Sequence, residues 1–286
     1  MDSLVYALGV LLIMVYPSFA EKSWRELERE VVFHPWSAPK IDELRTEFSV
    51  APQGIDQKSI PVTLPKYEKA VYKLGWGAFN AGYAILEIDR RRDTLKLAGK
   101  AVTNKFITPV YRVRDYVYSL GSSDDLYPYF FEQWIEEKEY HQRRWTLYDF
   151  KRDTVFRYTG KELKRTSVKG DVHNYMTLLY ALRNMPLGVG DDIVLPCYVH
   201  DKYYDIHFHV LKKEDMRTLG GKRSCYKIQP ILVGEGEHGF NKKDKMYLWI
   251  TDDSERVLVK VKAKERLGHV YATLYYYENG TTQWQD

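Results

Sequence analysis

Two histidines in this sequence stand at a spacing that can bind metal. In the run HFH, His207 and His209 point to the same side of a strand, a spacing found in some zinc sites, and His200 lies nearby in the sequence. A zinc site also needs a further ligand and supporting hydrogen-bonded groups, and the sequence locates neither. We therefore expect exposed strand histidines, with no metal and no cofactor.

Paired acidic residues could support acid–base chemistry. Asp252 and Asp253 are adjacent in TDDSE, and two carboxylates can act as general acid and base. Aspartate is also favoured in turns between strands, because its side chain bonds the turn backbone, and this explanation is the simpler one. Another acid, Asp115, could pair with Arg112 or Arg114 inside a barrel wall. We expect no catalytic residue among these groups.

The run GEGEHG, residues 234–239, matches the G-x-G-x-x-G pattern of phosphate-binding loops. A dinucleotide site needs a helix directly after this loop, but the following FNKKDKMYLWI is polar and then strand-like. The run therefore predicts a hairpin loop. The chain also contains no G-x-S-x-G or Walker motif, so we expect a protein that is not an enzyme. The alternative is an envelope hydrolase with an unassigned carboxylate or histidine site.

Two cysteines, Cys197 and Cys225, lie in predicted strands of the C-terminal half. In an oxidising compartment an even pair predicts a disulfide between neighbouring strands. The alternative is two separately buried thiols that pack as small apolar side chains.

The N-terminus resembles a secretory signal peptide. An apolar run, residues 4–16, precedes Pro17, Ser18 and Ala20, so we expect cleavage after Ala20, export to the periplasm and no stable membrane span thereafter. Asp2 stands where a basic residue is usual, which leaves an uncleaved anchor or a misassigned start codon as alternatives. The net charge of +4 is spread along the chain and argues against nucleic acid as a partner.

Segments with period-two alternation dominate the chain after residue 66, and 24 tyrosines favour β structure. One run, DVHNYMTLLYALRNMPLGVG, has apolar residues at helical spacing and predicts a helix over 171–184, with Asp171 as its cap. A sheet of more than about ten twisted strands tends to curl. We therefore expect an all-β fold: a large antiparallel sheet curled into an open barrel or β-spiral around one central α-helix.

The domain organisation follows from these patterns. We expect a signal peptide (1–20), an N-terminal extension with a short helix and a Pro-rich linker (21–65), a single β domain (66–278) and a C-terminal tail (279–286).

Three glycines gather in YKLGWGAFNAGYAILEI, where two predicted strands meet. Gly77 and Gly82 can adopt positive φ and let the chain reverse direction. Gly75 lies inside a strand, where a glycine marks a bulge or the close approach of another group. We expect a folding role for all three; the alternative is a ligand near the backbone of Gly75, with Trp76 as a wall.

Three blocks together resemble the bacterial domain-of-unknown-function family numbered 3108 over roughly residues 66–278. They are YKLGWGAFNAGYAILEI, the helix ending LLYALRNMPLGVGD, and the closing hairpin YLWITDDSERVLVKVKAKERLGHVYATL. The resemblance implies an exported protein of Gram-negative envelopes with an open or spiral β-barrel, similar to periplasmic lipoprotein carriers, and it implies no established reaction.

These expectations favour a noncatalytic periplasmic binding protein. Its curled sheet and helix would shelter an apolar or lipid-like ligand, in a cavity lined by Trp76, Tyr175, Leu179 and Trp249, or would dock an envelope protein. The same four side chains are also compatible with ordinary core packing. A purely structural role would differ only in lacking a pocket.

Overall fold

Strands make up most of the chain in this computed structural model, which describes residues 62–285 apart from 77–78, 110, 169, 171, 200, 234–245 and 266–267. The strands are β1 (Tyr67–Trp76), β2 (Phe79–Arg91), β3 (Thr94–Thr103), β4 (Arg114–Ser122), β5 (Pro128–Glu137), β6 (Tyr140–Asp149), β7 (Thr154–Tyr158), β8 (Leu163–Ser167), β9 (Asp192–Val199), β10 (Lys202–Thr218), β11 (Gly221–Val233), β12 (Met246–Thr251), β13 (Leu258–Glu265), β14 (Gly268–Glu278) and β15 (Gln283–Gln285). The α-helix is α4 (Tyr175–Asn184), and a 3-10 turn, η1, covers Phe150–Arg152.

The strands form one antiparallel sheet in the order β8-β7-β6-β5-β4-β3-β2-β1-β14-β13-β12-β11-β10-β9, and β15 pairs with β14. Pairing of β1 with β14 joins the N-terminal run of strands to the C-terminal run. In the described part of the chain, no ladder of backbone hydrogen bonds joins β8 to β9, so the sheet is not closed. The prediction of a large, open antiparallel sheet is confirmed.

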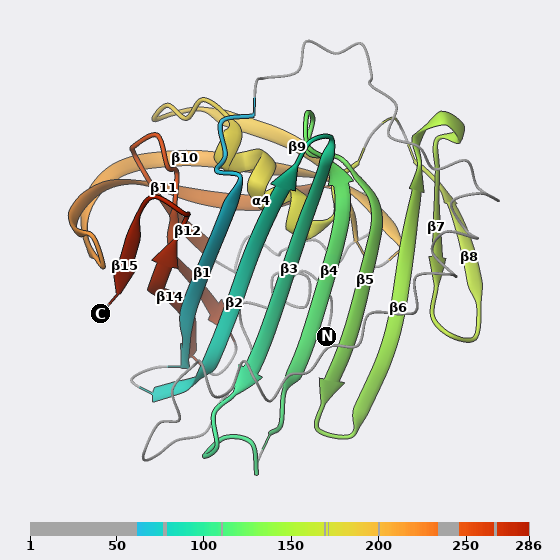
Figure 1. Cartoon of the computed structure of the whole chain (residues 1–286), viewed down its shortest axis with the longest axis horizontal. Helices are drawn as coiled ribbons and strands as arrows, with labels where there is room; N and C mark the ends of the chain where they lie inside the picture. The colour runs from blue at the N-terminus through green and yellow to red at the C-terminus, as the bar shows by residue number, and fades with distance from the viewer. Residues whose placement is uncertain are drawn as a thin grey trace.

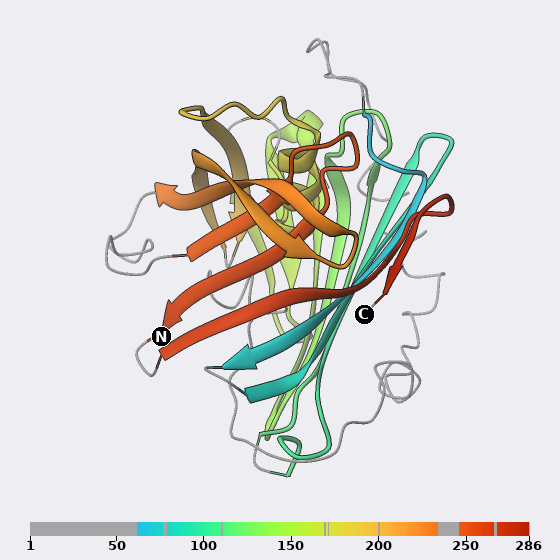
Figure 2. The ribbon, with the colours of Figure 1, turned by 90° about the vertical axis from the view of Figure 1, so that its left-hand side faces the viewer.

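The two runs of strands curl toward each other, with α4 between them (Figure 1, Figure 2). A sheet this long accumulates twist along its strand order, and rolling up buries one face. The main apolar core lies on this concave face and joins side chains such as Leu97, Val117, Ile206 and Ile228 with Leu182 of the helix.

Helix α4 begins later than the sequence predicts, because Asn174 supplies its cap. The Asn174 side chain accepts hydrogen bonds from the N–H groups of Met176 (2.9 Å) and Thr177 (3.0 Å). The Thr177 hydroxyl accepts one in return from the Asn174 N–H (3.2 Å), which completes a capping box. Asp171, the expected cap, lies outside the described residues.

The residues just before α4 bond to β9 instead of continuing the helix. The His173 N–H donates to the carbonyl of Pro196 (2.9 Å), and the Tyr198 N–H donates to the carbonyl of His173 (2.8 Å). This short parallel bridge ties the start of the helix to the last strand of the sheet order.

A buried ion pair fixes the other end of α4. Both nitrogens of the Arg183 fork donate to the two carboxylate oxygens of Glu68 on β1 (2.6 Å each), and Tyr277 donates to Glu68 as well (3.0 Å). Arg183 also donates to the carbonyls of Arg256 (2.7 Å) and Glu255 (3.2 Å). Burial alone lowers the pKa of Arg183, but the Glu68 carboxylate raises it overall, so the guanidinium stays charged.

Two strands were missed by the sequence analysis. Strand β8 is almost entirely exposed, and Leu163 is half exposed to solvent. Because neither face of this strand is buried, its sequence lacks the alternation of apolar and polar residues that marks a strand. The segment 279–286, expected to be a tail, contains β15. Its Trp284 is buried against the ring of Tyr277 (centroids 4.8 Å apart), which adds it to the core.

The last residues of the predicted N-terminal extension also pack on the sheet. Leu64 is buried in the core, and its carbonyl accepts a hydrogen bond from Arg90 (2.5 Å). The Thr63 N–H donates to the side chain of Asn184, the last residue of α4 (2.8 Å). The signal peptide and most of the extension lie outside the described residues.

Two of the three glycines are needed for close packing. Gly75 sits at a register shift between β1 and β2, and a Cβ there would lie 2.3 Å from the ring of Tyr271. Gly82 lies inside β2, without the positive φ that the sequence analysis proposed; a Cβ there would lie 2.0 Å from the carbonyl of Val102. Gly82 therefore serves a close strand-to-strand approach, not a turn. Gly77 lies outside the described residues.

The predicted disulfide between Cys197 and Cys225 is wrong, because both thiols are free and buried. Cys197 pairs across β9–β10 with Tyr204, and Cys225 pairs across β10–β11 with Glu214. Positions 204 and 214 are separated by about 30 Å along a strand, and a disulfide needs Cα atoms within about 7 Å. The alternative of two separate buried thiols describes the structure.

Removal of one partner of the ion pair should strongly destabilise the fold. We expect Arg183→Leu to lower the free energy of unfolding by about 3–5 kcal/mol, because it leaves the Glu68 carboxylate buried without a counter-charge. Urea unfolding followed by tryptophan fluorescence measures this change. The double variant Glu68→Leu, Arg183→Leu should recover much of the loss.

The matched control is the exposed pair Lys222–Asp215 (2.8 Å), which solvent screens. Lys222→Ala should leave the urea midpoint unchanged. Equal losses from Arg183→Leu and the double variant would contradict the view that the unpaired charge causes the destabilisation.

The two thiols provide a second test. We expect no reaction of the native protein with a thiol-specific reagent, because Cys197 and Cys225 are both buried and burial raises the pKa of each thiol. Two thiols should react in urea without any reductant. Detection of fewer than two would indicate a disulfide after all.

Candidate functional site

Polar side chains form a row across β5, β6, β7 and β8 on the concave face of the sheet. Gln133 on β5 lies opposite Arg144 on β6, and Thr146 on β6 lies opposite Arg157 on β7. Arg157 in turn lies opposite Lys164 on β8. We call these five residues the polar row. It places three basic side chains on a face that is otherwise mainly apolar.

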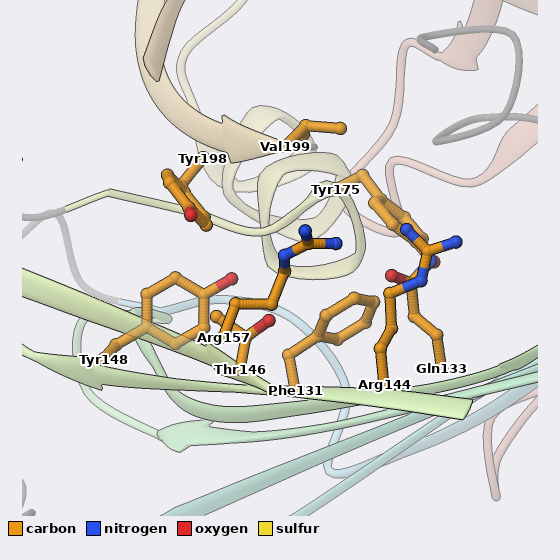
Figure 3. A pocket seen from close by; sticks show the side chains of 9 residues that line it. All are labelled: Phe131, Gln133, Arg144, Thr146, Tyr148, Arg157, Tyr175, Tyr198 and Val199. Carbon is orange, nitrogen blue, oxygen red and sulfur yellow. The ribbon is translucent and has the colours of Figure 1, made fainter. Parts of the chain in front are cut away.

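A small pocket lies between the polar row, the start of α4 and the end of β9; we call it the arginine pocket (Figure 3). Its lining is Phe131, Gln133, Arg144, Thr146, Tyr148, Arg157, Tyr175, Tyr198 and Val199. Figure 3 shows Arg144 and Arg157 rising from the sheet toward α4, with Tyr148 and Tyr198 beside Arg157. The enclosed volume is about 20 Å³, room for about one water molecule.

Hydrogen-bond donors dominate the arginine pocket. Gln133 donates through its amide nitrogen to the Tyr175 hydroxyl (2.7 Å). Burial raises the pKa of the Tyr175 and Tyr148 hydroxyls well above their ordinary value and raises the pKa of Tyr198 to about 12, so all three stay protonated near neutral pH. The pocket therefore presents positive charge and neutral hydroxyls.

The two arginines differ in their partners. Arg157 forms an ion pair with Asp201 in the β9–β10 turn. Arg144 donates to the amide oxygen of Gln142 (2.6 Å), and its Nε is buried with no hydrogen-bond partner among the described residues. Burial lowers the pKa of Arg144, with a smaller contribution from Arg157, while Tyr140, Tyr175 and Asp201 raise it in part. Arg144 is thus a half-buried cation that forms no ion pair in the described part of the chain, and Asp201, the acid that acts on it, is paired with Arg157.

Asp201 also connects the two ends of the open sheet. Besides Arg157, it accepts hydrogen bonds from Lys164 of β8 (3.3 Å) and from Tyr198 of β9 (3.3 Å). Tyr198 and Thr166 of β8 share a further hydrogen bond (3.1 Å). We call this set of side-chain contacts between β7–β8 and the end of β9 the seam. The arginine pocket lies directly beside it.

A second pocket, which is apolar, lies along α4 on the side of β9–β12. Its lining is Tyr175, Leu178, Leu179, Leu182, Cys197, Ile206, Phe208, Pro230 and Leu248. The cavity expected between sheet and helix is present, but it also encloses only about 20 Å³. Tyr175 lines both pockets and separates the polar one from the apolar one.

The four predicted lining residues do not come together. Tyr175 and Leu179 line the apolar pocket, as expected. Trp249 does not, because it follows Leu248 on β12 and therefore points to the other face, where Lys227 and Lys260 lie over its ring. The side chain of Trp76 lies outside the described residues.

A pair of carboxyl groups is buried on the concave face near the arginine pocket. Asp115 of β4 and Glu137 of β5 are hydrogen-bonded to each other, and Tyr111 donates to Glu137 (3.0 Å). Burial and the adjacent Glu137 raise the pKa of Asp115 to about 8, although the Glu136 N–H donates to it (3.0 Å). Of the two arginines expected as partners of Asp115, Arg112 pairs with Glu136 instead, and Asp115 shares a hydrogen bond with a second acid.

The histidines and aspartates singled out in the sequence have local partners. His207 and His209 both turn Nδ1 toward Asp192 on β9 (2.9 and 3.2 Å). Asp253 accepts hydrogen bonds from the N–H groups of Glu255 and Arg256 (3.1 Å each), as a turn aspartate does. Among the described residues, no group of three or more His, Cys, Asp or Glu side chains is arranged to hold a metal ion. GEGEHG lies outside the described residues.

The acid pair predicts how stability depends on pH. The folded protein keeps a proton on Asp115 that the unfolded chain loses at about pH 3.9, so the free energy of unfolding should fall as pH rises from about 4 to about 8. The slope is at most about 1.4 kcal/mol per pH unit for one proton. Asp115→Asn keeps a neutral partner for Glu137 and should flatten this slope.

Urea unfolding of both proteins at pH 5, 6.5 and 8 measures the difference. Asp215→Asn, on an exposed side chain, is the matched control and should leave the slope unchanged. An Asp115→Asn protein with the wild-type slope would show that another group takes up the proton.

Solved structures similar to this chain include a beta-barrel-like protein of the domain-of-unknown-function family DUF1849 from Brucella abortus. It aligns with a TM-score of 0.54 at 9% identity, over 77% of this chain and 100% of that chain. At this identity the likeness shows the fold alone.

Two further structures align with TM-scores too low to support an argument. One is a candidate lipoprotein from Parabacteroides distasonis (TM-score 0.32, 11% identity, 76% of this chain and 98% of that chain). The other is a candidate exported protein with a YmcC-like fold from Bacteroides fragilis (0.29, 11%, 75% and 97%).

Sequence comparison gives a clearer result. No curated protein matches this chain at a significant level. A family model, described as protein of unknown function (DUF3108), matches residues 71–275, and this confirms the resemblance seen in the three sequence blocks. The chain belongs to the DUF3108 family of proteins of unknown function.

Proposed function

We propose that this protein is an exported, noncatalytic binding protein of the Gram-negative cell envelope, and that its ligand enters the arginine pocket. The observation that carries this proposal is Arg144, a half-buried guanidinium that forms no ion pair among the described residues. An uncompensated buried charge is costly in a folded protein, and a bound ligand that supplies the counter-charge removes that cost.

The composition of the pocket favours binding over catalysis. None of its nine lining residues is a His, Cys, Asp or Glu. Acid–base and nucleophilic catalysis most often use such a group within hydrogen-bond reach of the substrate, and burial keeps the tyrosine hydroxyls of this pocket protonated. A set of donors alone can hold and orient a ligand without changing it.

A lipid-like ligand has weaker support. The apolar pocket along α4 has the right lining but encloses only about 20 Å³, so an acyl chain enters only if α4 separates from β9–β12. In the other form of the binding hypothesis, the protein docks an envelope protein. Native mass spectrometry, described below, distinguishes a bound protein from a bound small ligand.

Export rests on the N-terminal sequence, with its apolar run before Ala20, and on the expectation for the family. The helix of the described region is too short and too polar to cross a membrane.

The acid pair favours a second candidate, an envelope hydrolase that uses Asp115 and Glu137. Two carboxyls that share a proton are a common acid–base device. Both side chains are about 95% buried and bond to each other, so a substrate reaches them only after local opening. We therefore place this candidate second.

Native mass spectrometry of the protein purified from the envelope of its native host tests the proposed function. We expect a mass above that of the polypeptide, in a species that dissociates on denaturation, because a ligand that compensates Arg144 should remain bound. Arg144→Gln purified in the same way should carry less of it.

A bare polypeptide mass accompanied by a second protein would favour docking. A bare mass with no partner would contradict the binding hypothesis. Turnover of a generic ester or glycoside substrate that Asp115→Asn abolishes would favour the hydrolase.

A further inference from the structure

The polar row and the seam together carry more positive than negative charge. Arg144, Arg157 and Lys164 supply three cations, and Asp201 is the one acid that contacts any of them among the described residues. Asp201 engages Nε and Nη2 of Arg157, and Nη1 has no hydrogen-bond partner among the described residues. Arg144 keeps Nε without a partner.

The neutral donors around the two arginines come from several directions. Thr146 and Tyr148 belong to β6, Tyr175 begins α4, and Tyr198 belongs to β9 on the other side of the seam. A carboxylate is planar and is satisfied by a single arginine fork, whereas a phosphate group has oxygens in three dimensions and is matched by donors converging from several sides.

We propose that the arginine pocket binds the phosphate group of a phosphomonoester, held between Arg144 and Nη1 of Arg157, with the hydroxyls of Tyr175 and Thr146 completing its hydrogen bonds. This inference rests on the proposed function and names its ligand class. The pocket encloses only about 20 Å³, so the phosphate group enters it only if the side chains that line it move apart, and the remainder of the ligand stays outside.

The phosphate can belong to either of two sources. A soluble phosphomonoester would use the arginine pocket alone. A lipid with a phosphomonoester head group would also place apolar atoms beyond Tyr175, which separates the arginine pocket from the apolar one. The phosphate groups of the two sources make the same contacts with Arg144 and Arg157. The two sources differ in whether the acyl chains of the ligand add to its affinity.

Isothermal titration calorimetry at low ionic strength tests the inference with three probes: inorganic phosphate, glycerol 3-phosphate and dihexanoyl phosphatidic acid below its critical micelle concentration. Acetate is the planar-anion comparison. We expect saturable one-to-one binding of at least one phosphate probe, tighter than that of acetate. Tighter binding of the lipid than of glycerol 3-phosphate identifies a lipid head group, and equal binding identifies a soluble ester.

Variants separate the pocket from general electrostatic attraction. Arg144→Gln should weaken phosphate binding about tenfold or more, the usual effect of removing a charge-assisted hydrogen bond. Arg165→Gln is the matched control, because it removes the same charge from β8 but on the opposite face, where Arg165 lies over the ring of Phe156. It should bind as the wild type does. Near-ultraviolet circular dichroism checks that both variants are folded.

Two results would overturn the inference. One is the absence of saturable binding for every phosphate probe; the other is equal weakening by Arg144→Gln and Arg165→Gln. If native mass spectrometry still finds a ligand without phosphorus, the proposed binding function stands and only the ligand class is wrong. If phosphate binds in titration but no ligand co-purifies, the phosphate site is correct, and the proposal that the site is occupied in the cell is wrong.

Discussion

The bidentate contact between Arg183 and Glu68 is the interaction on which the rest of the structure depends. It joins the C-terminal turn of α4 to β1, the strand at which the two runs of the sheet meet. A helix with apolar side chains all round can lie in a curled sheet at many rotations, but a buried charge pair is satisfied at only one. The capping box at Asn174 and the bridge from His173 to β9 fix the opposite end of the helix.

Once α4 is fixed, the position of the arginine pocket follows. The first residue of the helix, Tyr175, faces Gln133 and Arg144 across the concave side, and the last strand of the sheet brings Tyr198 next to Arg157. The sheet stays open at this point, and side-chain contacts replace a ladder of backbone hydrogen bonds. Polar side chains are tolerated there because the seam lies at the edge of the core, where charged groups keep partial contact with solvent.

Three buried polar systems on the concave face have different chemical characters. The pair Glu68–Arg183 is fully compensated and serves the fold. The pair Asp115–Glu137 is held by a proton and makes stability depend on pH. Among the described residues Arg144 forms neither an ion pair nor a shared-proton contact, which is why it is the group assigned to a ligand.

The sequence by itself determined most of the strand pattern, helix α4 and the family, because two-residue and helical periodicities are local properties of the chain. It could not locate the arginine pocket. A sequence-based interpretation assigns the apolar residues of β6, Trp145 and Leu147, to the core, and therefore places Arg144 in solvent. In the structure Trp145 and Leu147 pack in a small cluster on the outer face, so Arg144 lies on the concave face. Nor could it find Glu68 as the partner of Arg183 or rule out the Cys197–Cys225 disulfide. These depend on which strands become neighbours and which face curls inward, and only the tertiary structure decides both.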